Sequence, residues 1–343
     1  MQVKLIGMDI SKHFFQVHGA DERGKAVVRK RLYRSDVREF FVNLSPCVVA
    51  MEACASAHYW ARELKALGHE VKLIAPQFVK PYVRSNKNDR ADAEAICEAA
   101  SRPEMRFVAA KSVEQQDIQA LHRVRERLVS ARTALCNEIR GLLSEYGIII
   151  AQGRLRLSKE LSAVLEKNRE TLTGMALQMF LDLQAELSRL TEQVETYDHL
   201  LERIHKAHPV CQQLTTIPGV GSITSTALIA MVGDVNNFKN GRQFAAYLGL
   251  VPKQHSTGGK NRLLGISKRG DTYLRKLLVH GARSVLLQAG KKSDQRSRWL
   301  IDLYKRRGTN RAVVALANKN ARVIWAVMSK GSRYFASYHE VAA

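Results

Sequence analysis

The chain has 343 residues, a formal net charge of +22 and 45% hydrophobic residues. This hydrophobic content predicts folded domains rather than general disorder, and the length allows two or three of them. The sequence has no run of about 18 apolar residues, so we expect no membrane span, and its start lacks the pattern of a secretory leader. Five widely spaced cysteines without a C-x-x-C pair argue against disulfides and structural zinc, so we expect a cytoplasmic protein.

The first 105 residues alternate short apolar runs with helical patterns. Three consecutive strands, which we expect to be linked as hairpins, precede strand–helix units. This order predicts an α/β domain whose mixed sheet has an antiparallel edge, with helices packed over it. The expected strands are 3–8, 14–19, 26–32, 47–51 and 71–75, and the expected helices are 37–44, 57–67 and 91–100.

Four acidic residues stand out at the ends of these elements. Asp9 and Glu52 each follow an apolar strand pattern, whereas Asp89 and Asp92 open a helical pattern and share one helical face. Each alone has an ordinary explanation, such as a turn position or a helix N-cap. Mg²⁺ prefers oxygen ligands, and two such ions about 4 Å apart assist phosphodiester chemistry. In so basic a chain, the four carboxylates predict a two-Mg²⁺ site that acts on nucleic acid.

Two long helices are expected in the middle of the chain, at 113–146 and 157–205. In the second, apolar residues recur at steps of three and four, with charged residues between them. A repeat this long requires a partner. Two interpretations remain open, an antiparallel helical hairpin that separates two domains and a coiled coil that joins protomers.

After Pro209 the pattern changes to short helices, glycine turns and basic residues, which predicts a separate C-terminal domain. Its final helix is expected at 310–328, followed by a tail from about 337. Residues 251–343 contain 20 Lys and Arg against 4 Asp and Glu. So basic a folded segment indicates a polyanionic partner such as nucleic acid, with a merely soluble basic surface as the alternative.

Gly219 and Gly221 lie in an apolar-Pro-Gly-apolar-Gly turn at 217–221, before an apolar helical run at 227–232. Backbone amides at such a helix start can hold a phosphate, and the turn resembles the hairpin of helix-hairpin-helix modules. A plain corner between two helices explains the same residues equally well.

A second glycine-rich segment, His-Ser-Thr-Gly-Gly-Lys at 255–260, carries hydroxyls beside clustered cations. A hydroxyl there could attack phosphorus, and Ser256, Thr257 and Ser267 all compete for this role. The pattern alone favours a mobile basic hairpin. His255 is not assigned as the base, because neighbouring strand residues point to opposite sides. The cations expected to contact nucleic acid are Lys260, Arg262, Lys268, Arg269, Arg275 and Lys276.

Together these motifs resemble the DEDD-type transposases of the insertion sequence 110 family, and more closely its insertion sequence 1111 branch. The matching stretches lie at 7–12, 51–53, 86–93, 217–221, 244–252, 255–260 and 266–270, and nearly the whole chain is covered. The resemblance implies a RuvC-like, ribonuclease-H-type N-terminal domain that binds metal through Asp9, Glu52, Asp89 and Asp92. It also implies a C-terminal transposase domain whose serine, here Ser256, forms a covalent phosphoserine link to DNA.

The function implied by the resemblance is RNA-guided cutting and rejoining of donor and target DNA. The guide would be a structured, bridge-type RNA encoded by the element, and the protein would form homodimers that assemble into tetramers. The expected regions are 1–105 (RuvC-like), 106–208 (helical, oligomerising), 209–336 (mostly α-helical transposase domain) and 337–343 (tail). Two other functions compete with this one, a RuvC-like endonuclease that hydrolyses DNA with water and a non-catalytic nucleic-acid-binding protein.

Overall fold

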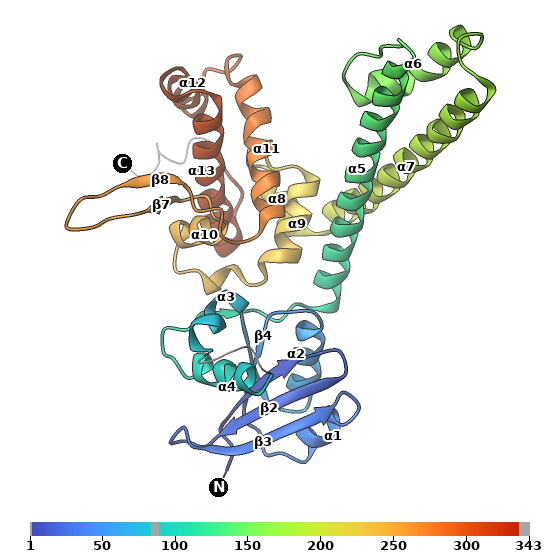
Figure 1. Cartoon of the computed structure of the whole chain (residues 1–343). Helices are drawn as coiled ribbons and strands as arrows, with labels where there is room; N and C mark the ends of the chain where they lie inside the picture. Colours follow the sequence, from blue (N-terminus) through green and yellow to red (C-terminus); the bar gives the residue numbers. More distant parts are fainter. Residues whose placement is uncertain (1, 84–88, 336–343) are drawn as a thin grey trace. The chain divides into compact units, whose positions relative to one another are not determined.

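The computed structural model describes residues 2–83 and 89–335, and for Asp89 it describes the backbone only. The chain divides into two compact units, Met1–Gln116 and Asp117–Ala343 (Figure 1). None of the described helices combines the length and apolar character needed to cross a bilayer. The division into regions at 105 and 208 remains a prediction about function.

A six-stranded mixed sheet forms the centre of the first unit, in the order β3-β2-β1-β4-β5-β6. The first three strands are antiparallel neighbours, whereas β4 runs parallel to both β1 and β5. The predicted mixed sheet with an antiparallel edge is therefore confirmed. The strands are β1 (Leu5–Ile10), β2 (Phe14–Ala20), β3 (Ala26–Tyr33), β4 (Val48–Glu52), β5 (Glu70–Ile74) and β6 (Phe107–Val108).

Helices cover both faces of this sheet because its central strands are apolar on both sides. Ile6 and Met8 of β1 belong to a buried cluster that includes residues of α1 and α2. Ala50 of β4 belongs to a second cluster, which includes Ile96 of α4. The helices of this unit are α1 (Val37–Val42), α2 (Ala57–Ala66), α3 (Pro76–Val79), the 3-10 turn η1 (Lys80–Tyr82) and α4 (Asp89–Ala100).

Helix α5 (Val113–Glu145) leads into the second unit, where it packs with α6 (Arg154–Lys167) and α7 (Gly174–Ala207). The expectation of a single helix over 157–205 is wrong, because α6 ends at Lys167 and a separate helix, α7, begins at Gly174. Thr173 starts α7 by accepting a hydrogen bond from the Ala176 amide. The apolar repeat thus has a partner within the chain, which favours the helical hairpin, while contact between protomers remains a prediction.

The C-terminal part is mostly helical, as predicted, and has its own buried cluster. A two-stranded antiparallel ribbon, β7 (Pro252–Gln254) and β8 (Leu263–Ile266), extends from the helices (Figure 1). The helices are α8 (Pro209–Leu214), α9 (Ser222–Val232), the 3-10 turn η2 (Val235–Asn237), α10 (Gly241–Tyr247), α11 (Thr272–Ala289), α12 (Gln295–Arg307) and α13 (Thr309–Lys330).

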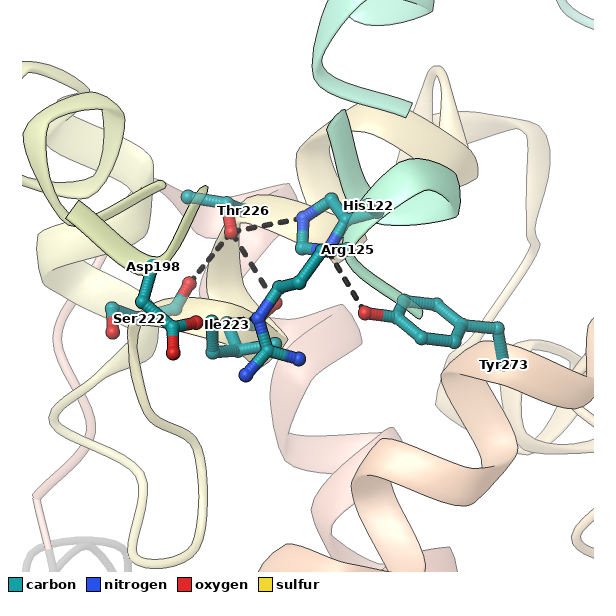
Figure 2. A network of polar contacts seen from close by, with 7 residues as sticks. All are labelled: His122, Arg125, Asp198, Ser222, Ile223, Thr226 and Tyr273. Carbon is teal, nitrogen blue, oxygen red and sulfur yellow. Dashed lines mark hydrogen bonds and ion pairs between the residues drawn. The ribbon is translucent and has the colours of Figure 1, made fainter. Parts of the chain in front are cut away.

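A buried histidine connects α5 to two of these helices. His122 has no exposed surface, and its ring lies between Thr226 of α9 and Tyr273 of α11 (Figure 2). The Thr226 hydroxyl donates to the Ser222 carbonyl at 2.7 Å, so the Nε2–H of His122 donates to Thr226 at 3.1 Å. The other ring nitrogen, Nδ1, then accepts from the Tyr273 hydroxyl at 3.0 Å. Burial lowers the pKa of His122 to about 4, so the ring is neutral near pH 7 and carries a single N–H, as this assignment assumes.

Candidate active site

Asp9 and Glu52 occupy adjacent positions on two paired strands. In the parallel pairing of β1 with β4, Met8 lies opposite Met51, and one acidic residue follows each methionine. Glu52 ends β4 as expected, but Asp9 lies inside β1, because pairing with β2 continues that strand to Ile10. Side chains alternate along a strand, so both acidic residues belong to the sheet face that α4 covers.

Gly7 allows α4 to lie directly on β1. A Cβ atom at Gly7 would come within 2.2 Å of the Ala93 carbonyl oxygen and 2.5 Å of the Cys97 amide nitrogen. Two residues earlier in the strand, the Leu5 carbonyl is 4.0 Å from the Cys97 thiol. The helix therefore runs antiparallel to the strand, and its first turn lies towards the end of β1 that carries Asp9.

This arrangement brings Asp9, Glu52 and the first turn of α4 to the same end of the sheet. Two residues of a strand and four residues of a helix both span roughly 6 Å. Moving from Gly7 to Asp9 along β1 therefore covers the same distance as moving from Ala93 back to the first turn of α4. That turn contains Asp89 and Asp92. The side chain of Asp89 lies outside the described residues, so its part in the site stays a prediction.

The negative charges of both carboxylates affect the pKa of a thiol beside the strands. The pKa of Cys54 is raised, first by burial and then by the negative charges of Glu52 and Asp9. Among the described side chains, no three His, Cys, Asp or Glu residues form a ready metal cluster. The donor set itself is made of carboxylates, with Asp9, Glu52 and Asp92 each half-buried, and oxygen donors of this kind suit Mg²⁺.

The serine segment forms the tip of the β7–β8 ribbon. Thr257 and Lys260 exchange backbone hydrogen bonds of 3.4 and 3.1 Å across the turn. Between them, Gly258 and Gly259 have positive φ angles of 56° and 78°. Two consecutive residues of this conformation make a type I′ turn, which matches the twist of an antiparallel hairpin. The paired glycines thus produce an ordered hairpin end.

The hydroxyl of Ser256 is exposed and held in place by two polar neighbours. It accepts a hydrogen bond from Gln254 Nε2 at 2.9 Å and donates one to Asn261 Oδ1 at 3.1 Å. Gln254 also donates to Asn261 at 3.3 Å, which closes a small network. Neither neighbour was predicted from the sequence, although Gln254 lies two residues from Ser256 and residues at that spacing share one side of a strand.

The six predicted nucleic-acid cations separate into two groups. Arg275 donates to the Leu248 carbonyl at 3.2 Å, and Lys276 forms an ion pair with Glu126. These two side chains therefore also connect parts of the folded chain. The four others are exposed on or beside the ribbon, namely Lys260, Arg262, Lys268 and Arg269.

The glycine turn before α9 packs against α11. A Cβ atom at Gly219 would lie 2.8 Å from the Gly281 carbonyl oxygen, so the two backbones meet here. This contact accounts for Gly219 as a corner between helices without any ligand. Gly221 is exposed and open on its Cα side, at the start of α9. Contact of either glycine with nucleic acid remains a prediction.

The chain is similar to known transposases. Residues 6–148 match the model of the DEDD transposases of IS110, described as Transposase, and residues 211–298 match the Transposase IS116/IS110/IS902 family. The chain is 52% identical to a probable family 20 transposase of Pseudomonas aeruginosa, over 97% of this chain and 99% of that protein. It is 48% identical to the transposase for insertion sequence element IS1111A of Coxiella burnetii, over 97% and 91% respectively. The chain belongs to the IS110/IS116/IS902 family of insertion-sequence transposases, which act on DNA.

Proposed function

We propose that this transposase cuts and rejoins DNA through a covalent phosphoserine link at Ser256. The observation that carries the proposal is the accessible Ser256 hydroxyl, which Gln254 and Asn261 orient on a cationic hairpin. A hydroxyl fixed by neighbours needs less ordering before it attacks, and nearby cations attract the phosphate.

The proposed metal ligands are Asp9, Glu52, Asp89 and Asp92, on a RuvC-like domain. The sheet order and the antiparallel edge support this fold, and the shared face of Asp9 and Glu52 supports the ligand set. When bound, Mg²⁺ would neutralise negative charge on the phosphodiester. Without cations, carboxylates gathered at one end of the sheet would repel one another and cost stability, which argues against a purely structural role.

The proposed chemistry conserves the number of phosphoester bonds. The Ser256 oxygen forms a bond to phosphorus while one bond between phosphorus and a deoxyribose oxygen breaks, and the serine proton leaves with a base. A deoxyribose hydroxyl of another strand then attacks the phosphoserine and releases the serine. Because each step exchanges one phosphoester for another, no high-energy cofactor is needed. Lys260 and Arg262 would hold the DNA backbone during both steps.

We also propose that a structured guide RNA encoded by the element selects donor and target DNA by base pairing. The protein would then read backbone and shape rather than base edges. The exposed cations of the ribbon support this division, because Lys and Arg contacts to phosphate carry no sequence information. Homodimers that assemble into tetramers would bring two DNA partners together.

The test of this proposal is a protein–DNA adduct. Purified protein is incubated with Mg²⁺, RNA transcribed from the flank of the element and labelled donor DNA, and then separated by denaturing electrophoresis. We expect label to migrate with the parent protein, and not with Ser256→Ala or Glu52→Gln. Ser267→Ala is the matched control, because Ser267 is a competing hydroxyl that this proposal does not use, and this variant should form the adduct normally. Normal cleavage by Ser256→Ala without any adduct would instead establish hydrolysis by water.

A further inference from the structure

We infer that a pocket between α12 and α13 binds one unpaired nucleotide of a nucleic acid. The inference rests on the proposed function to the extent that nucleic acid is the substrate, but not on the serine chemistry. The cavity measures about 400 Å³, within the range of small-ligand pockets. It lies where the start of α12, the end of α13 and the segment after α13 meet. None of its lining residues belongs to the candidate active site.

Aromatic rings form the apolar side of this pocket. Trp299 comes from α12, whereas Tyr334 and Phe335 come from the segment after α13. That segment is held in place by the Tyr334 amide, which donates to the Thr216 hydroxyl at 2.9 Å. Phe335 is 58% exposed. Rings of this kind can stack on a nucleobase of any sequence.

The polar side of the pocket is strongly cationic. Its only carboxylate among the described lining residues, Asp294, caps α12 and is already engaged by the Ser297 hydroxyl at 2.6 Å and the Ser297 amide at 3.0 Å. Burial, followed by the charges of Arg296 and Arg322, lowers the pKa of Lys319. Four cationic side chains line the cavity, namely Arg296, Lys319, Lys330 and Arg333.

Two of these cations lie against the aromatic rings. The Lys319 ammonium is 4.7 Å from the centre of the Trp299 ring, and the Arg296 guanidinium carbon is 5.4 Å from the centre of the Tyr334 ring. In each pair the cation lies over one face of the ring, so a base would stack on a ring face that the cation leaves open. A nucleotide, with its flat base and adjoining phosphate, matches this combination in one molecule.

Arg296 has buried hydrogen-bond donors that lack partners among the described residues. One guanidinium nitrogen, Nη2, donates to the Asn320 side chain. The other two nitrogens, Nε and Nη1, are buried and have no hydrogen-bond partner among the described residues. Buried donors without partners destabilise a fold, and a bound ligand or ion is one way to supply the missing partner.

An unpaired nucleotide fits better than the other candidates. Bases inside a duplex are stacked and must leave the helix to enter a pocket, whereas bulges and single strands expose them already. An acidic peptide would satisfy the cations but would leave the aromatic rings without a flat partner. The sequence does not predict this site, because its residues come together only when α12 packs on α13.

The test compares two DNA duplexes that differ by one extrahelical nucleotide, 2-aminopurine. Binding of the full-length protein is measured by fluorescence anisotropy in EDTA, so that cleavage plays no part. We expect the parent to bind the bulged duplex more tightly than the fully paired one, with quenching of 2-aminopurine by stacking. Phe335→Ala and Trp299→Leu should each weaken binding of the bulged duplex by about fivefold or more and leave the paired duplex unchanged.

Two further variants complete the comparison. Trp299→Phe keeps a ring and should preserve the preference for the bulge. Tyr304→Ala removes another exposed ring of α12, outside the pocket lining, and should change nothing. Phe335 is exposed, so its variant keeps the test valid even if Trp299→Leu fails to fold.

Equal binding of the two duplexes by the parent would overturn the pocket assignment and leave the serine chemistry untouched. An equal loss on both duplexes in the Phe335→Ala variant would also overturn it. Loss of the covalent adduct in Ser256→Ala is measured separately and does not depend on this pocket. If neither duplex binds at all, the pocket assignment is wrong, and the adduct assay with Mg²⁺ and RNA decides separately on the proposed function.

Discussion

His122 is a single residue whose protonation limits the stability of the second unit. Burial, and to a lesser degree Arg125, lowers its pKa to about 4 from an ordinary value of 6.5. Between these two pH values, the unfolded chain binds a proton that the folded chain does not. Stability is therefore unaffected above about pH 6.5, decreases as the pH falls, and has lost about 3 kcal/mol from this group near pH 4.

The variant His122→Gln isolates this contribution. Its amide can donate to Thr226 and accept from Tyr273, but it does not titrate. Urea unfolding of the second unit is monitored through hydrogen exchange in peptides of α9. We expect the free energy of unfolding to fall less steeply from pH 7 to pH 4 in the variant than in the parent. Identical pH dependence in the two proteins would show that His122 does not control acid stability.

Gly7 determines how closely α4 approaches the carboxylate end of the sheet. A methyl group there would overlap the Ala93 carbonyl, so we expect Gly7→Ala to destabilise the first unit by roughly 1–3 kcal/mol. Gly141, inside α5, has no neighbour within 4 Å of an added Cβ. Gly141→Ala should therefore be neutral or stabilising by up to about 1 kcal/mol. Urea unfolding measures both variants, and an equal effect of the two would disprove the close-packing argument.

At the scale of elements, the β7–β8 ribbon depends on its turn conformation. Asn-Gly at 258–259 also forms a type I′ turn, whereas Ala-Ala is disfavoured by about 1–2 kcal/mol per residue. We expect the Asn-Gly variant to form the DNA adduct at the parental rate, and the Ala-Ala variant to be slower by about tenfold or more. Equal rates for the two variants would mean that the hairpin conformation does not position Ser256.

The types of most elements could be predicted from the sequence, because strand alternation and helical spacing are local properties. The break between α6 and α7 was missed, since the apolar spacing continues across it through the buried Leu172. Thr173 followed by Gly174 was the available signal, a helix N-cap before a residue that disfavours a helix interior. The shift of β1 to Leu5–Ile10 depends on its partner β2, which local spacing cannot reveal.

The candidate site could be predicted only as far as its residue types. Carboxylates at strand ends were visible, but their common sheet face depends on the parallel register of β1 and β4. Likewise, nothing in the sequence distinguished the ion-paired Lys276 from the exposed Lys260, because Glu126, the partner of Lys276, is far from it in the sequence. Tertiary packing therefore decides which of the predicted cations are available to DNA.

For the whole molecule, the excess of positive charge predicts strongly salt-dependent binding. Each phosphate contact that a Lys or Arg makes contributes about −0.9 to the slope of log K against log salt on duplex DNA. We expect Lys260→Ala to reduce this slope by about that amount. Arg169→Ala is the control, because Arg169 pairs with Glu166 at 3.6 Å outside the ribbon, and its slope should equal that of the parent. An unchanged slope for Lys260→Ala would remove Lys260 from the DNA contact.

The most direct measurement of the central claim identifies the residue that carries the DNA. The adduct is digested with nuclease and trypsin, and the peptides are sequenced by tandem mass spectrometry. We predict a phosphate-linked remnant on Ser256, in the tryptic peptide 254–260. A remnant on Thr257, on Ser267 or on any other side chain, or complete cleavage of DNA without a modified peptide, would contradict the phosphoserine mechanism at Ser256.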